Sequence, residues 1–219
     1  MQVKNLSFKH HKNAPDFFKD LSFDLEPNKI HALHGKNGVG KTVLLHLLSR
    51  KMSSQAIFEG EIIGGEKTVL VNQRFDHMIA DQFTFKENLK FACMDPFPHA
   101  FSRLKQPEFY PDFLDQFHID ITQPVSKLSG GQRQILALLM VLQRRMDMLL
   151  LDEPTATLDE QNAVMVFDFL KTLTSQQVTL LVVCHDRELI NRYTTGKHLH
   201  LEMESSGVRR LKTSYDQPA

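Results

Sequence analysis

The chain alternates between short apolar runs and segments in which apolar residues recur at helical spacing. Short apolar runs predict buried strands at 29–35, 148–154 and 178–186, and further strands are expected at 68–73 and 197–203. Apolar residues that repeat every three or four positions predict helices at 42–52, 131–145 and 161–173. Strands that alternate with helices are typical of an α/β fold with a mostly parallel sheet, whose ligand binds at the carboxyl ends of the strands.

Residues 75–125 differ in character from the rest of the chain. They hold nine of the 16 phenylalanines and five of the nine prolines. Thr84 and Glu87 have the spacing of a capping box, which predicts the start of a short helix at 85–94. We therefore expect a single domain, 1–219, in which a helical subdomain at 75–125 is inserted into a core made of 1–74 and 126–219.

Composition narrows the class of protein and of partner. The 26 basic and 26 acidic residues cancel to a formal net charge of +0, which argues against a nucleic-acid partner. Two cysteines are too few for a disulfide framework, and the first residues lack the regions of a signal peptide. The longest apolar run, 135–142, is far shorter than the roughly 18 residues that span a bilayer. We expect a soluble protein in a reducing compartment, for which a role at a membrane comes through a partner.

A glycine-rich turn follows the first predicted buried strand and precedes a helix. Gly35, Gly40, Lys41 and Thr42 have the spacing of a P-loop, the Walker A pattern. Its glycines let backbone N–H groups converge on phosphate oxygens at the positive end of the helix. Lys41 is expected to reach the β- and γ-phosphates, and the Thr42 hydroxyl is expected to bind Mg²⁺.

Two acids, Asp152 and Glu153, follow the apolar run at 148–151. Taken alone, they could be an ordinary exit from a strand into a loop. Beside a P-loop, Asp152 fits the Walker B role of holding Mg²⁺ through water. Glu153 is then placed to take a proton from the water that attacks the γ-phosphate.

A second glycine-rich turn, LSGGQ at 128–132, carries a resemblance to a known family. Around it, Gln73 stands at the place of a Q-loop glutamine, TATLD at 155–159 resembles a D-loop, and His185 in VVCHD stands at the place of an H-loop histidine. Over essentially its whole length the sequence resembles the nucleotide-binding subunit of ABC ATPases. The resemblance implies a P-loop NTPase core with a mostly parallel sheet, a small antiparallel edge subdomain and an inserted helical subdomain that carries the signature turn.

The resemblance also implies roles for individual residues, with ATP and Mg²⁺ as cofactors. The triphosphate would be lined by Gly35, Lys36, Asn37, Gly38, Val39, Gly40, Lys41, Thr42 and Val43. Catalysis would depend on Lys41, Gln73, Glu153 and His185, and the metal would be held by Thr42, Gln73 and Asp152. A second subunit would contribute Ser129, Gly130, Gly131, Gln132 and Asp159, because the signature turn is expected to reach the nucleotide of its partner in a head-to-tail dimer.

Three departures from the family pattern affect these expectations. Val43 replaces the usual second threonine and removes a hydroxyl contact to the α-phosphate. The usual tyrosine that stacks on adenine is absent, and His10 takes its place, with His11, Phe8 and Phe17 as rivals. The segment before Gln73 is short, so the antiparallel edge around 58–67 is expected to be trimmed. Another set of residues is interpreted as structural or surface: His31, His34, His198, His200 and Cys184.

The resemblance implies a subunit that hydrolyses ATP in an ATP-dependent homodimer, or in a heterodimer with a similar ATPase, and powers a separate integral membrane permease. It would lie on the cytoplasmic face of the inner membrane and contact the permease through the helical subdomain, where some of Phe75, Met78, Phe83, Phe85 and Phe91 would line an apolar groove. Import of a small nutrient is favoured, but exporters have ATPases of the same size. The alternative is a non-transport ABC ATPase of a cell-division or Fe–S assembly complex. A module that does not hydrolyse ATP is disfavoured because Glu153 and His185 are both present.

Overall fold

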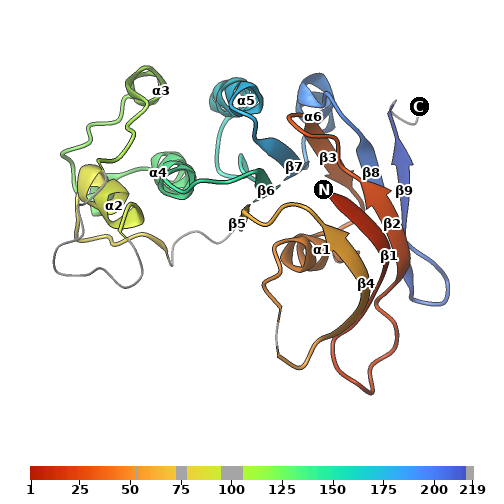
Figure 1. Cartoon of the computed structure of the whole chain (residues 1–219). Coiled ribbons are helices and arrows are strands. Elements are labelled where there is room, and N and C mark those ends of the chain that lie inside the picture. Colours follow the sequence, from red (N-terminus) through yellow and green to blue (C-terminus); the bar gives the residue numbers. More distant parts are fainter. Residues whose placement is uncertain (53, 73–77, 95–105, 216–219) are drawn as a thin grey trace.

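A single mixed sheet with helices on both of its faces forms the protein (Figure 1). The computed structural model describes residues 1–52, 54–72, 78–94 and 106–215. Over these ranges the sheet has nine strands in the order β4-β1-β2-β9-β8-β3-β7-β6-β5. The α/β class predicted from the sequence is confirmed, and the sheet divides into a parallel part and an antiparallel part.

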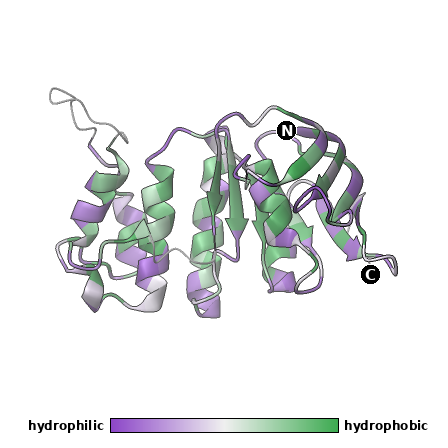
Figure 2. Cartoon of the chain, turned by 90° about the horizontal axis from the view of Figure 1, so that it is seen from below, coloured by the Kyte–Doolittle hydropathy of each residue, from purple (hydrophilic) through white to green (hydrophobic). Residues whose placement is uncertain are grey.

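The parallel part contains the strands predicted from apolar runs. It is made of β5 (Thr68–Val71), β6 (Met148–Asp152), β7 (Thr179–Val183), β3 (Ile30–His34) and β8 (His198–Met203). Successive residues of β6 face opposite sides: Leu149 and Leu151 pack into one hydrophobic cluster, whereas Met148 and Leu150 pack into a second. β6 and β7 are buried at every position, and burial on both faces explains why they read as continuous apolar runs. Figure 2 shows the central strands as mainly hydrophobic and the surrounding helices as mixed.

The antiparallel part confirms the predicted edge subdomain. β1 (Gln2–Lys9) pairs antiparallel with β2 (Phe18–Asp24) and with β4 (Ile57–Ile63), while β9 (Arg209–Ser214) pairs antiparallel with β8. The short segment before residue 68 still forms a seven-residue strand, β4, along β1. The sequence patterns do not predict β9, whose exposed and half-buried positions show no buried face.

The helices cover the two faces of the sheet unequally. α1 (Lys41–Leu48) lies on one face, and the other face carries α4 (Gly130–Leu142), α5 (Glu160–Ser175) and α6 (Arg187–Tyr193) (Figure 1). The predicted helix at 42–52 ends early, because Arg50 adopts a left-handed φ of 56°. Among the described helices, none combines the length and the apolar character needed to cross a bilayer.

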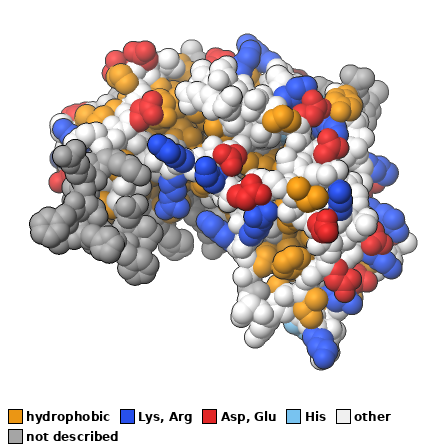
Figure 3. Space-filling model, in the orientation of Figure 1, with side chains coloured by type: hydrophobic (Ala, Val, Ile, Leu, Met, Phe, Trp, Pro, Cys, Tyr) orange, Lys and Arg blue, Asp and Glu red, His pale blue; other side chains and the backbone are white. Residues whose placement is uncertain are grey.

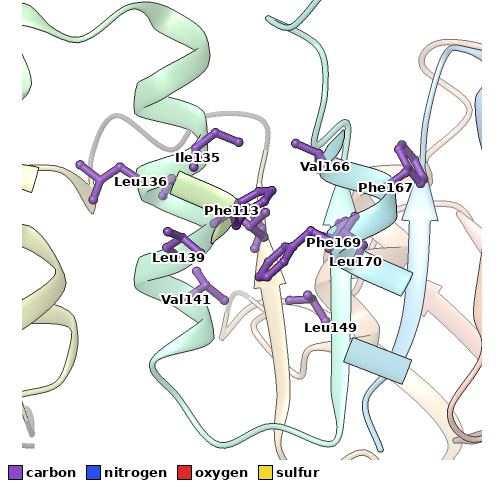
Figure 4. Close-up of a cluster of buried hydrophobic side chains, with 14 of the residues drawn as sticks. Phe113, Ile135, Leu136, Leu139, Val141, Leu149, Val166, Phe167, Phe169 and Leu170 are labelled. Atoms are coloured by element: carbon purple, nitrogen blue, oxygen red, sulfur yellow. The ribbon is translucent and has the colours of Figure 1, made fainter. Parts of the chain in front are cut away.

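The described part of 75–125 is helical and packs against α4 and α5. It contains α2 (Phe85–Ala92) and α3 (Pro111–Gln116), and the predicted capping box of Thr84 and Glu87 begins α2. Phe113 of α3 stacks on Phe169 of α5 with ring centroids 4.0 Å apart (Figure 4). One hydrophobic cluster therefore extends from this region into the core of the protein. The division of the chain into a core and a helical subdomain at 75–125 stays a prediction.

Candidate nucleotide site

The first glycine-rich turn joins β3 to α1 in the arrangement that a phosphate loop requires. Gly38 and Gly40 have left-handed φ values of 76° and 109°. A Cβ on Gly40 would lie 2.6 Å from Cε1 of Phe17, so the turn depends on glycine at this position for space as well as for conformation. Gly40 is also the N-cap of α1, which directs the helix N-terminus at the loop.

Lys41 is held over the phosphate loop by the loop itself. Its Nζ donates hydrogen bonds to the carbonyl oxygens of Gly35, at 2.8 Å, and Lys36, at 3.3 Å. An ammonium group has three hydrogens, so it can bind a phosphate oxygen while it keeps contact with the loop. This position agrees with the role expected for Lys41.

Thr42 and Asp152, both predicted to serve the metal, lie in direct contact. Thr42 Oγ1 donates a hydrogen bond of 2.6 Å to Asp152 Oδ2, and Asp152 is 7% exposed. A hydroxyl and a carboxylate are the oxygen ligands that suit Mg²⁺, which takes its other ligands from water and substrate phosphates. The described residues contain no cluster of three or more His, Cys, Asp or Glu side chains able to hold a metal by themselves. The pair therefore fits a magnesium ion shared with a phosphate ligand.

Glu153, the predicted base, and His185, the predicted H-loop histidine, are paired. They follow β6 and β7, neighbouring strands that end side by side, with Asp152 opposite Val183. His185 Nε2 lies 2.7 Å from Glu153 Oε1, and the two side chains are 58% and 15% exposed. Both line a cavity of about 290 Å³ together with Thr155, Ala156, Leu158, Glu160, Ala163, Cys184, Asp186 and Leu189. A carboxylate in this position can accept a proton from a water molecule that the imidazole helps to orient.

The signature turn, LSGGQ at 128–132, leads into the N-terminus of the 13-residue helix α4. Ser129 is the N-cap: its Oγ accepts a hydrogen bond from the Gln132 N–H, and the Gln132 side chain accepts one from the Ser129 N–H. Gln132 Nε2 also donates to the Phe117 carbonyl at 3.2 Å. The Gln132 side chain therefore has a structural role within its own chain that the sequence did not indicate, while Ser129 and Gly130 are exposed.

Asp159 likewise has a local role that sequence reasoning missed. It is the N-cap of α5, and its carboxylate accepts hydrogen bonds of 2.8 Å from the N–H and the side-chain amide of Asn162. An aspartate followed three residues later by a polar residue before a helical run is a capping signal. The exposed position of Asp159 remains compatible with a contact to a second subunit.

A second cavity, of about 610 Å³, lies beside the phosphate loop. Its walls come from His34, Gly35, Lys36, Asn37, Gly38, Val39, Arg187, His200, Leu201, Glu202 and Met203. The Ser129–Gln132 turn is absent from these walls among the residues that the structure describes. α4 and α1 also lie on opposite faces of the sheet (Figure 1).

Three histidines stack next to this cavity, which the sequence did not predict. Parallel pairing of β3 with β8 sets His34 opposite His200, with ring centroids 4.8 Å apart. His34 Nε2 also lies 2.9 Å from Nδ1 of His198. Burial, followed by the charges of the neighbouring histidines, Arg187 and Lys41, lowers the pKa of His34 to about 4. His34 is therefore neutral near pH 7. Only the register in which β3 pairs with β8 brings His34 and His200 together, and local sequence patterns do not reveal that register.

The aromatic residues proposed for adenine gather at the other end of the loop. Phe8 is buried, whereas His10 is exposed and meets the Phe17 ring edge-on at 4.8 Å. The Phe17 ring contacts Gly40, and the Arg209 guanidinium lies 3.8 Å from its centroid. His10 and His11 are therefore the exposed rings of this group, whereas Phe8 is buried and Phe17 is half-buried.

Val43 and Gln73 also have predicted roles at the nucleotide, and the structure describes only Val43. Val43, which replaces a threonine, is half-buried and packs against the cluster around α1 and the antiparallel strands. The valine side chain contributes apolar burial there, and the predicted loss of a contact to the α-phosphate stays a prediction. Gln73 and Phe75 lie outside the described residues, so the roles predicted for them remain predictions.

Comparisons with known proteins agree with this geometry. Residues 18–156 match the family model described as ABC transporter. The chain is 31% identical over 210 residues to a "Probable iron chelatin transport ATP-binding protein" of Helicobacter pylori, covering 89% of this chain and 81% of the relative. It is 27% identical to a protein of onion yellows phytoplasma that bears the name of an ABC transporter ATP-binding protein. It spans 34% of that relative's length.

Two solved structures show the same fold. One is a transporter described as of the metal-chelate type, in an inward-facing conformation, with a TM-score of 0.71, 26% identity and coverage of 97% of this chain and 82% of that one. The other is a dimeric ATP-binding cassette in a post-hydrolysis state with bound ADP and Pi, with a TM-score of 0.72, 19% identity and coverage of 99% of each chain.

Proposed function

This chain belongs to the ABC transporter family, as an ATP-binding subunit, and we propose from that premise that it hydrolyses ATP to drive a separate membrane-spanning permease. The observation that carries the proposal is the pairing of Glu153 with His185 at 2.7 Å, beside the contact of Thr42 with Asp152. Thr42 and Asp152 can position a metal-bound phosphate, and the adjacent pair of Glu153 and His185 can activate water.

Each residue of the site has a distinct task in hydrolysis. Lys41 balances charge on the β- and γ-phosphates from its place over the loop. Thr42 and Asp152 would hold Mg²⁺, which supplies further charge neutralisation when it is bound. Glu153 accepts the proton of the attacking water, and His185 orients both the water and the carboxylate. Gln73 is proposed to contact the same metal and water.

The second subunit completes the site in this proposal. Ser129 and Gly130 are exposed at the start of α4, on the face of the sheet opposite α1. An exposed helix N-terminus with a serine N-cap offers a hydroxyl and backbone N–H groups to an anion. We propose that this turn, with Gly131, Gln132 and Asp159, contacts the nucleotide bound by a partner copy or by a similar ATPase. The dimeric cassette with the same fold supports such an arrangement.

The surface around α2 is the proposed contact with the permease. Met78, Phe83, Phe91 and Met94 are exposed there, and the Phe83 and Phe91 rings meet edge-on at 5.0 Å. Phe85, by contrast, is fully buried and belongs to the core. Adjacent exposed apolar side chains of this size are typical of a groove that accepts a partner helix. We name the four exposed residues the α2 apolar surface.

Chelated metal is the proposed cargo class, and import is the proposed direction. Two relatives above 25% identity carry names that refer to an iron chelatin and to the metal-chelate type. The division and Fe–S assembly alternatives have no comparable support. Acidic and basic side chains are interspersed over the face shown in Figure 3, in line with the proposal that nucleic acid is not a partner. The permease contact would hold the chain at the cytoplasmic face of the inner membrane.

Reconstituted transport tests this function. The chain would be purified with the multi-span membrane protein that it captures from its own membranes, and both would be placed in vesicles with a labelled ferric chelate and MgATP. Uptake that requires ATP and is lost with Glu153→Gln is the expected result. Capture of soluble assembly factors alone, with no membrane protein, would overturn the transport proposal.

A further inference from the structure

A polar side chain, Gln134, is buried directly before the apolar stretch of α4. Gln134 of α4 is 6% exposed, and the buried residues that follow it up to Val141 are all apolar. Figure 4 shows Ile135, Leu136 and Leu139 on the same helix within the hydrophobic cluster. Burial of an amide is costly unless its donors and acceptor are satisfied, so the partners of Gln134 indicate what the residue is for.

The partners of Gln134 belong to the segment that carries the proposed base. Gln134 Nε2 donates a hydrogen bond of 3.2 Å to the Glu153 carbonyl oxygen. Its Oε1 accepts hydrogen bonds from the N–H and the hydroxyl of Thr157. One side chain on the signature helix therefore binds both ends of the short segment between Glu153 and Thr157.

The backbone of Glu153 needs such support. Its φ is 57°, in the left-handed region that non-glycine residues seldom occupy and that surrounding contacts must stabilise. The Glu153 N–H donates to the Val183 carbonyl at 2.9 Å, and the Glu153 carbonyl accepts from Gln134. β7 thus holds one side of the residue and α4 holds the other. The Glu153 carbonyl also accepts a hydrogen bond of 3.3 Å from the Ala156 N–H, so Gln134 acts together with the backbone of the segment itself to hold this conformation.

A second contact presses the same segment against α4. A Cβ added to Gly131 would lie 2.7 Å from Cδ2 of Leu158. The first turn of α4 is therefore in close contact with Thr157 and Leu158, and neither segment can shift along the other without rearrangement.

We propose that Gln134 is a positioning residue that couples the signature helix to the carboxylate of Glu153. The inference rests on the proposed function, in which the N-terminus of α4 serves the nucleotide of the partner while Glu153 serves the nucleotide of its own chain. When the partner's nucleotide draws the signature turn into place, Gln134 carries that change to the Glu153 backbone. The two halves of the split site are thereby linked through one amide.

Gln134→Leu tests the proposal through turnover. Leucine fills the space but cannot donate to the Glu153 carbonyl. The kcat should fall by about 100-fold, the order expected when a catalytic group is misplaced by about 1 Å. The KM for MgATP should stay unchanged, because Gln134 contacts none of the proposed nucleotide ligands of its own chain. A lowered melting temperature with wild-type kcat would show a structural role alone and would overturn the proposal.

Gln134→Glu supplies a readout that a structural role does not give. A protonated carboxyl can donate to the Glu153 carbonyl and accept from Thr157, whereas an ionised carboxylate repels the carbonyl. Burial raises the pKa of such a carboxyl, so kcat relative to wild type should rise as the pH is lowered. The ratio to wild type is taken at each pH because it removes any pH dependence that the two proteins share. A ratio that is flat with pH, or that rises equally for Gln134→Leu, would overturn the proposal.

The control separates this inference from the proposed function. If Glu153→Gln hydrolyses ATP like wild type, the assignment of the base fails and the positioning role fails with it. If Glu153→Gln is inactive while Gln134→Leu keeps its kcat and Gln134→Glu has a flat ratio, the proposed function stands and the positioning role alone is wrong.

Discussion

Thr42 Oγ1 donates a 2.6 Å hydrogen bond to Asp152 Oδ2, joining the start of α1 to the end of β6 across 110 residues of sequence. The two residues come from different motifs, and the contact brings the phosphate loop and the acidic strand end together at one point. The relationship makes a specific prediction about metal dependence.

Removal of the Thr42 hydroxyl should weaken the response to Mg²⁺. Thr42→Val keeps the shape of the side chain but removes an oxygen ligand, so a higher Mg²⁺ concentration should be needed for half-maximal hydrolysis. Thr42→Ser keeps the hydroxyl and serves as the matched control, with a requirement close to wild type. Equal Mg²⁺ titrations for all three proteins would contradict the assignment.

Glu153→Gln should separate ATP binding from hydrolysis. The amide has the size of the carboxylate but lacks its basicity, so turnover should fall by roughly 10²–10⁴-fold, as expected for loss of a general base. ATP affinity should be retained, since the Lys41 and Thr42 contacts are untouched. Steady-state turnover together with equilibrium nucleotide binding checks both parts.

The signature turn should act on the partner's nucleotide. Ser129→Arg places a bulky side chain at the exposed start of α4, so ATP should bind to the single chain while the ATP-dependent dimer is lost. Size-exclusion chromatography in a Glu153→Gln background measures the dimer directly. Ser206→Arg, in the exposed turn between β8 and β9, is the control and should dimerise normally. If the Ser129→Arg protein dimerises as well, the split-site proposal is wrong.

The α2 apolar surface should be needed for coupling alone. Phe91 is 46% exposed, so Phe91→Glu should leave ATP binding, dimerisation and basal hydrolysis intact while it abolishes binding to the permease. Phe58→Glu alters another exposed phenylalanine, on the edge strand β4, and should leave permease binding unchanged. Cysteine crosslinking from positions 78 to 90 should identify a cytoplasmic loop of the permease. Crosslinks to soluble proteins alone would contradict this role.

The stacked histidines predict how stability depends on pH. The pKa of His34 is lowered to about 4, chiefly by burial, from an ordinary value near 6.5. Between these values the unfolded chain binds a proton that the folded chain excludes, so the free energy of unfolding should fall as the pH drops from about 6.5 to about 4. Denaturant unfolding of His34→Gln should show a shallower fall than wild type over this range. His11→Gln, at an exposed loop position, should follow wild type.

Local patterns in the sequence were sufficient for the motifs and for the parallel strands. β6 and β7 are buried on both faces, which leaves continuous apolar runs, and Gly40 and Lys41 belong to one contiguous strand, turn and helix. Thr84 begins α2 through a capping box with Glu87 that spans only four residues. Each of these features depends on residues that are near each other in the chain, so their spacing alone predicts them.

Long-range pairing decided the rest, because it leaves no period in the local sequence. The His34 stack exists because β3 pairs with β8 in one register, and a shift by one residue would send His200 to the opposite face. The Gln134 amide reads as an ordinary polar residue of a helix until α4 is packed beside the segment after β6. A side chain's neighbours across the core are set by the packing of whole elements, and that packing is determined only when the complete chain has folded.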